Sequence, residues 1–312
     1  MVVMRMRTAL LVSLAYAGLA CAAPDELEDS YKALKEAEGK KDPDRLKKTA
    51  LETSKLARDV IASKQPEDAD EVETWKGRVE FAKGVDKYTE YALSVGALEP
   101  IEPARAVDLV ETLLTQNPKS EYIAQCSGAY LVALGKLGAE QQVAGATKLI
   151  AILPNNEEVL YILVNGTRRT PDRALAYATR LQTVLATKAK PEGISDADWQ
   201  AKKTAMLGTA NYVAGIIQGE KQMWTDCDRN LRAALSFVSK DPQSSAAAYF
   251  YLGLANYQLG KMVQDKARLQ EAAKFSDLSA AIKGPYQETA FKNSLAIKKE
   301  AGITTTPAPK KK

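Results

Sequence analysis

Glycines recur seven residues apart inside helical sequence, and this spacing restricts the chain to folds built from closely packed helices. The clearest case is AAAYFYLGLANYQLGK, Ala246 to Lys261, which contains Gly253 and Gly260. A glycine inside a helix costs about 0.5–1 kcal/mol relative to alanine, so it needs a compensating role. At Gly253 the missing Cβ is expected to let two helices approach closely. Gly260 is expected to end the helix in the left-handed conformation.

The same spacing occurs elsewhere, which indicates an internal repeat. Related segments read CSGAYLVALG, MLGTANYVAG and WKGRVEFAKG. Their glycines are Gly128 with Gly135, Gly208 with Gly215, and Gly77 with Gly84. A second helical segment follows each of them, with apolar or small residues three and four positions apart. We therefore expect antiparallel helix pairs stacked in a row.

The second helices are clearest after Pro103 and after Pro171. In PARAVDLVETLLTQNPKS one face carries Ala106, Val110 and Leu113, and Pro118 ends the helix. In PDRALAYATRLQTVL the inward positions are Ala174, Ala178 and Leu181. Composition agrees, because alanine, leucine, lysine and glutamate dominate and β-branched runs are missing. The fold class predicted is all-α, with about six helix pairs.

These helical segments resemble the tetratricopeptide repeat family. In YFYLGLANYQLGK the family's aromatic, Leu-Gly and turn-glycine positions are Tyr249, Leu252 with Gly253, and Gly260. Asn256 stands where tyrosine is usual. In the second helix Asp265 departs from the pattern, whereas Leu269 and Ala272 agree with it. The earlier second helix matches throughout, at Ala106, Val110, Leu113 and Pro118.

The resemblance implies a right-handed α-solenoid, with residues 23–300 as the repeat domain. The clearest repeats lie near 88–118, 119–154, 195–242 and 245–278. They are longer and less regular than the family's unit of ~34 residues, and a generic helical repeat of the HEAT kind is the alternative. A last helix, PYQETAFKNSLAIKKE at 285–300, is expected to shield the exposed end.

The N-terminus has the pattern of an export signal. Arg5 and Arg7 precede an apolar run too short to span a bilayer, and small residues follow it. Cleavage after Ala22 would give a soluble periplasmic or secreted protein, with residues 1–22 as the signal. Alternatively, residues 1–20 are a lipoprotein signal, and Cys21 is acylated. In that case the protein is an envelope lipoprotein, and this lipid is its only expected membrane contact.

Charge argues against a nucleic-acid partner. The chain has a formal net charge of +4. Two of these positive charges belong to Arg5 and Arg7 and three to Lys310, Lys311 and Lys312, which leaves −1 for the rest. A nearly neutral folded part does not have the basic surface of a protein that binds nucleic acid. Residues 301–312 are expected to form a disordered basic tail.

Residues that carry enzyme chemistry are scarce. The sequence contains no histidine, which removes histidine bases and most zinc and iron sites. Neither a G-x-S-x-G motif nor a phosphate-binding loop occurs. Cys126 and Cys227 lie in apolar helical segments and are predicted to be buried free thiols. We expect no metal, no cofactor and no catalytic residue.

The resemblance implies a protein that binds other proteins, because first helices of such repeats line a concave surface. The corresponding stripe carries Phe250, Leu254 and Tyr257, and Tyr212 one unit earlier. An apolar, aromatic face predicts a hydrophobic peptide or helix as partner, although these residues would also suit packing between adjacent units. The favoured function is an exported scaffold of the cell envelope. The alternatives are a glycan- or small-ligand-binding accessory subunit, which exposed tryptophans would favour, and a histidine-free enzyme.

Overall fold

The computed structural model describes residues 25–303, and every regular element in this range is an α-helix. The prediction of an all-α fold is confirmed. The segment expected to be an export signal, with Cys21, and the lysines at 310–312 lie outside the described residues. The chain divides into two compact units, with the boundary in the sequence between Ala92 and Leu93.

The N-terminal unit is built from α1 (Glu26–Lys40), α2 (Pro43–Ile61) and most of α3 (Ala69–Leu98). Its apolar core combines Leu27 from α1 and Ala57 from α2 with Ala82 and Val85 from α3. Polar contacts reinforce the packing of α2 on α3, because Asp86 accepts hydrogen bonds from Ser54 and Arg58. These three helices therefore share one core.

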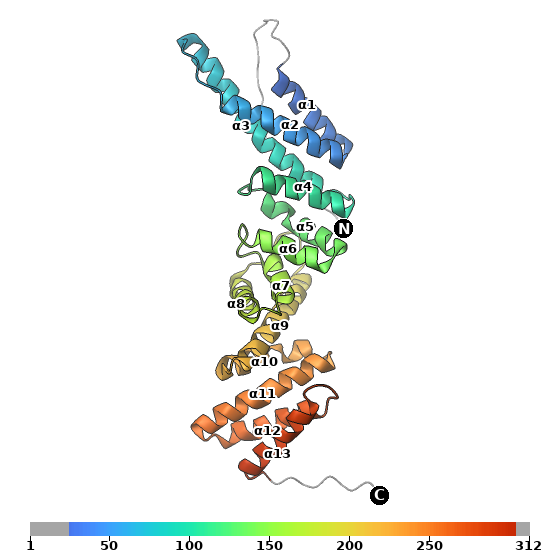
Figure 1. The fold of residues 1–312 in the computed structure, drawn as a ribbon, viewed down its shortest axis with the longest axis vertical. Coiled ribbons are helices and arrows are strands. Elements are labelled where there is room, and N and C mark those ends of the chain that lie inside the picture. Colours follow the sequence, from blue (N-terminus) through green and yellow to red (C-terminus); the bar gives the residue numbers. More distant parts are fainter. Residues whose placement is uncertain (1–24, 304–312) are drawn as a thin grey trace. The chain divides into compact units, whose positions relative to one another are not determined.

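The C-terminal unit is a succession of helices in which each contacts the next (Figure 1). Its helices are α4 (Pro103–Gln116), α5 (Ile123–Leu137), α6 (Ala139–Leu149), α7 (Glu157–Gly166), α8 (Pro171–Thr187), α9 (Asp196–Glu220), α10 (Trp224–Val238), α11 (Pro242–Val263), α12 (Lys266–Ala280) and α13 (Gln287–Glu300). Short connections make successive helices antiparallel neighbours. Contacts of this kind are consistent with a solenoid of stacked helix pairs.

A second set of contacts skips one helix. Helix α7 contacts α9, α9 contacts α11, and α11 contacts α13. We call these four helices the first-helix row, because α8, α10 and α12 each follow one of them as second helices. The row forms a continuous side of the unit, so residues on neighbouring members can act together.

Local sequence explains where the helices begin. Asp42, Asn156, Ser195 and Asp241 are N-caps whose side chains accept hydrogen bonds from backbone N–H groups of the first turn. Proline stands at the start of the four helices α2, α4, α8 and α11, where its missing N–H costs nothing. At the start of α9 the Asp198 N–H donates a hydrogen bond to the N-cap Ser195 Oγ at 3.1 Å.

The close-approach role predicted for Gly253 agrees with its surroundings. A Cβ atom there would lie 2.7 Å from Ser276 Oγ, 3.3 Å from Ser276 N and 3.4 Å from the Ala272 carbonyl oxygen, all on α12. The other paired glycines from Gly128 onward also face neighbours. A Cβ at Gly208 would overlap the Phe237 ring, at Gly215 it would meet Leu231, at Gly135 Gln142, and at Gly128 Glu158.

Two glycine predictions need correction. Gly260 is helical and buried, and the left-handed residue that ends α11 is Gln264, with φ of 56°. Gly260 is a packing residue instead, because a Cβ there would lie 3.1 Å from Arg268 Cβ on α12. Gly77 and Gly84 lie within α3, and a Cβ at either would meet nothing within 4 Å. Their spacing therefore does not mark a close helix crossing.

The predicted core positions are buried. Ala106, Val110 and Leu113 face inward from α4, which ends two residues before Pro118. Ala174, Ala178 and Leu181 belong to one apolar cluster between α7, α8 and α9. In α11, Leu252 is fully buried, and the half-buried Tyr249 stacks on Phe275 with ring centroids 6.1 Å apart.

Both cysteines in the described residues are buried free thiols, as predicted. Burial raises the pKa of Cys126 to about 11 and that of Cys227 to about 12. Neither thiol therefore ionises appreciably at neutral pH, and a protonated thiol is a poor nucleophile. Their role is that of small apolar core residues.

Candidate binding surface

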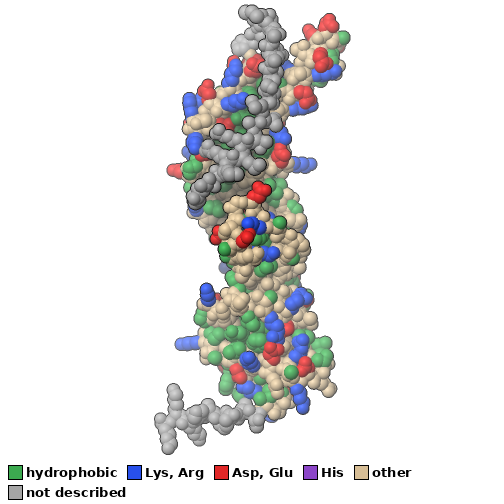
Figure 2. Space-filling model, turned by 180° about the vertical axis from the view of Figure 1, so that it is seen from behind, with side chains coloured by type: hydrophobic (Ala, Val, Ile, Leu, Met, Phe, Trp, Pro, Cys, Tyr) green, Lys and Arg blue, Asp and Glu red, His purple; other side chains and the backbone are tan. Residues whose placement is uncertain are grey.

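Aromatic side chains gather where α9, α11 and the residue before α13 meet. We call Tyr212, Phe250, Tyr251 and Tyr286 the aromatic patch. The Phe250 ring centroid lies 5.2 Å from that of Tyr251 and 4.9 Å from that of Tyr286. All four side chains are half-buried, and Figure 2 shows hydrophobic side chains gathered on one face of the C-terminal helices. The patch is thus a partly accessible surface on the first-helix row.

The folding of α11 explains why these rings are grouped. Leu252 and Ala255 turn toward the core shared with α10, together with the cluster member Phe275 from α12. Phe250 and Tyr251 precede them and contact Tyr286, which stands immediately before α13. Contact between α11 and α13 brings that residue close to α11. The patch therefore exists only because three successive members of the row are stacked.

The Tyr251 and Tyr286 hydroxyls stay protonated at neutral pH. Burial is the main reason that the pKa of Tyr251 is raised to about 12, and the neighbouring Tyr286 and Glu220 contribute to the same rise. Burial also raises the pKa of Tyr286, with smaller effects from Tyr212 and Glu220. Neutral phenols combine an apolar ring with a hydrogen-bonding group. Such a surface suits the apolar and aromatic side chains of a peptide, with polar backbone at their edge.

The predicted stripe of Phe250, Leu254 and Tyr257 is half-buried along its length. Phe250 packs on Tyr286, and the Tyr257 hydroxyl donates to Glu300 Oε2 at 2.6 Å. The stripe therefore contacts the α13 region near both of its ends. Tyr212, predicted for the preceding unit, is half-buried and packs against the same core cluster as Tyr251. The structure brings Phe250 and Tyr212 to one surface with two residues that the spacing did not indicate, Tyr251 and Tyr286.

Comparison with known proteins adds no relative. No protein-family model matches the chain, and no curated protein is significantly similar to it. The residues of the chain itself are therefore the basis for its proposed function.

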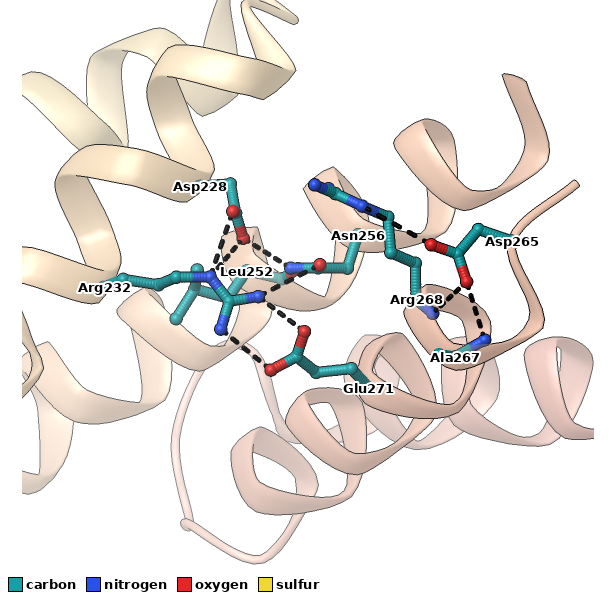
Figure 3. A network of polar contacts seen from close by, with 8 residues as sticks. All are labelled: Asp228, Arg232, Leu252, Asn256, Asp265, Ala267, Arg268 and Glu271. Atoms are coloured by element: carbon teal, nitrogen blue, oxygen red, sulfur yellow. Dashed lines mark hydrogen bonds and ion pairs between the residues drawn. The ribbon is translucent and has the colours of Figure 1, made fainter. Parts of the chain in front are cut away.

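Polar networks link consecutive helices within the C-terminal unit. The largest surrounds Arg232 on α10 (Figure 3). Its guanidinium donates to Asp228 at 2.9 Å, to Asn256 at 3.1 Å and to both oxygens of Glu271 at 2.8 and 2.6 Å. Asn256 is fully buried, and its amide donates to Asp228 and to the Leu252 carbonyl. Asn256, which departs from the family pattern, thus joins α11 to α10.

Two further networks have the same layout with different chemistry. Glu111 on α4 accepts hydrogen bonds from Tyr130 on α5 and from Lys148 on α6. Gln182 on α8 donates to Asn211 on α9 and to Asn230 on α10. Asn211 and Asn256 each stand three residues after a packing glycine. In all three networks the polar groups form hydrogen bonds with one another. Their role is therefore structural.

The tryptophans, which would favour a ligand-binding function if exposed, have partners within the protein. Trp199 is buried, Trp75 donates to Ser63 Oγ at 2.9 Å, and Trp224 packs against a core cluster. Among residues 25–303, no group of three or more His, Cys, Asp or Glu side chains is arranged to hold a metal ion. No helix in this range combines the length and apolar character needed to cross a bilayer.

Proposed function

We propose that this protein is a non-catalytic, exported interaction scaffold of the cell envelope. It binds an extended peptide or a helix of another protein on the first-helix row. The observation that carries this proposal is the aromatic patch, because half-buried aromatic residues on the first-helix row form a surface suited to apolar side chains. Nucleic acid is not among the expected partners, and no cofactor or metal is involved.

We further propose that the array is a right-handed solenoid of the tetratricopeptide kind, with about six helix pairs and α13 as terminal helix. Support comes from contacts along the first-helix row and from close helix packing at Gly253 and Gly208. In this arrangement the first helices line the concave side. The aromatic patch would then lie where a peptide partner binds in such repeats.

The proposal of export predicts the mass of the mature chain. Arg5, Arg7 and the apolar run that follows should direct secretion, so the protein should begin at Ala23, or at an acylated Cys21. Intact-mass measurement on protein from the natural host distinguishes these two outcomes, because acylation adds the mass of the lipid. A product that retains residues 1–22 would contradict the proposed location.

The proposed binding surface comprises the aromatic patch and the stripe of Phe250, Leu254 and Tyr257 that adjoins it. It predicts a loss of partner capture in the variant with Phe250→Ser and Tyr257→Ser. If the surface binds a partner, affinity should fall at least about tenfold, because buried aromatic anchors dominate interfaces. The measurement is affinity capture from the native envelope, with partners identified after cross-linking, combined with the thermal midpoint of each variant.

Met262→Ser is the matched control, since Met262 on the same helix is 76% exposed and lies outside both the patch and the stripe. It should leave both capture and midpoint unchanged. Truncating a fully buried aromatic side chain lowers the free energy of unfolding by about 3–5 kcal/mol. A comparable fall in stability for the double variant, with capture lost only through unfolding, would show that these residues serve packing alone.

A further inference from the structure

Helix α13 packs against α12 with one side only. Ala290, Ser294 and Ile297 are buried on that side. Ser294 Oγ donates to Asp277 Oδ1 of α12 at 2.6 Å, and Lys298 forms an ion pair with the same carboxylate at 2.7 Å. These contacts fix the orientation of α13 about its own axis.

The residues that directly follow Ala290 and Ser294 on the helix are exposed instead of buried. Phe291 is 55% exposed and Leu295 is 47% exposed. Both positions lie one turn apart, so they form an apolar stripe on the surface of α13. The sequence led us to expect that this helix shields the end of the array. It covers α12, but it leaves an apolar stripe of its own.

The exposed stripe of α13 corresponds in register to the residues of α11 that contact the next helix. Ala248 and Leu252 face back toward α10, and the residues that follow them, Tyr249 and Gly253, contact the next helix, α12. On α13 the back-facing residues are followed by Phe291 and Leu295. The stripe therefore occupies the register at which the array would accept another helix.

The residue types determine how such a helix can pack. Where α11 has Gly253, α13 has Leu295, so the very close crossing seen between α11 and α12 is blocked. A helix packed on this stripe must sit at the ordinary separation of about 8–10 Å between axes. That separation is typical of helices that meet through large side chains.

A negative charge lies beside one end of the stripe and a positive charge beside the other end. Glu288 lies in the first turn and Lys299 in the last turn, and helical periodicity puts both on the same side of the Phe291–Leu295 stripe. Two antiparallel copies of α13 related by a twofold axis would bring Glu288 of each opposite Lys299 of the other. The same arrangement places Phe291 against Leu295. Glu288 pairs with Lys292 in its own helix at 2.6 Å, but exposed pairs of this kind contribute little.

We propose that the exposed stripe of α13 binds α13 of a second copy of this chain, as an antiparallel twofold dimer. Self-complementary patches are the requirement for twofold association. A contact between two helices of this length is smaller than the interfaces of stable complexes, so the dimer is weak and depends on concentration. This surface differs from the aromatic patch and stands independently of the proposed function.

Sedimentation equilibrium of the purified chain tests the proposal. The wild-type chain should associate reversibly to a dimer, with a dissociation constant on the order of micromolar to a hundred micromolar. Phe291→Glu and Leu295→Glu should each weaken the dimer at least about tenfold. Met262→Glu is the matched control, because it adds the same charge at an exposed apolar residue of α11 and should leave association unchanged. Since all three residues are exposed, circular dichroism should show unchanged folding.

Charge reversal tests the antiparallel register. Glu288→Lys and Lys299→Glu should each weaken association at low salt, because each sets like charges opposite one another. The chain carrying both changes should regain dimerisation, since the opposed charges are again of opposite sign. A wild-type chain that stays monomeric at several hundred micromolar would overturn the dimer, whether residues 304–312 or another protein covers the stripe. A dimer unaffected by Phe291→Glu, or a double reversal as weak as the single ones, would equally overturn it.

Discussion

Replacing Gly253 with leucine is expected to lower the free energy of unfolding by roughly 1–3 kcal/mol, the usual range for overpacking. The new side chain would begin 2.7 Å from Ser276 Oγ, and backbone atoms of α12 lie only 3.3–3.4 Å away. The hydroxyl can rotate, but the backbone can move only if α11 and α12 separate. Chemical denaturation of the variant and the wild type measures the difference.

Gly77→Leu supplies the matched control for Gly253→Leu. Gly77 also lies inside a long helix, but a Cβ there would meet nothing within 4 Å. Because glycine is a poorer helix former than leucine, this change should be neutral or slightly stabilising. Equal midpoints for Gly253→Leu and wild type would refute the close-packing role of Gly253.

Arg232→Met is expected to destabilise the C-terminal unit by about 1–3 kcal/mol at neutral pH, as lost hydrogen bonds to charged groups do. Methionine retains much of the side-chain volume but donates no hydrogen bond. Asp228, with its side chain only 14% exposed, would lose the guanidinium, and so would Glu271. Urea denaturation at pH 7 measures this loss. Arg229→Met is the control, because Arg229 forms an exposed ion pair within its own helix.

The effect of Arg232→Met should depend on pH in a defined direction. The hydrogen bond from Arg232 is the main reason that the pKa of Glu271 is lowered from its ordinary value of 4.5. A lowered pKa means that the contribution of Glu271 is fully present above pH 4.5 and is lost as the pH falls through the folded-state value. The stability gap between wild type and variant should therefore narrow below about pH 4.5. A gap that stays constant down to pH 3 would contradict this account.

Helix boundaries followed from local sequence because they depend on local chemistry. Proline fixes the backbone angle at the start of α8 and removes a donor that the helix does not need there. The N-cap Ser195 supplies an acceptor for a first-turn N–H group through its own side chain. Neither effect requires a distant residue. The inward positions of α4 and α8 were equally predictable, since a helical period identifies one apolar face.

The glycine pattern was informative only in part. A spacing of seven residues identifies a face of a helix, but it does not reveal whether another helix lies against that face. Gly253 has α12 against it, whereas nothing lies close to Gly77. Gly260 was misjudged because α11 continues to Val263, where Gln264 adopts the left-handed conformation.

The aromatic patch was only half predictable for a related reason. Phe250 and Tyr212 follow from repeat spacing within first helices. Tyr286 precedes α13 outside any periodic pattern, and it reaches Phe250 only because α11 and α13 are in contact. The network around Asn256 likewise depends on groups from three helices. A departure from the family pattern at that position was visible in the sequence, but its partners were not.

The three polar networks make the helix junctions that they join chemically distinct from one another. One pairs a carboxylate with tyrosine and lysine, one joins amides, and one surrounds an arginine with carboxylates and an amide. If the unit carrying Asn211 stacked directly on α4, Glu111 would lose both the phenol and the ammonium group that neutralise and bind it. The order of units is therefore encoded by matched polar partners, and an array that lost or duplicated one internal pair would carry a mismatched, partly unsatisfied junction.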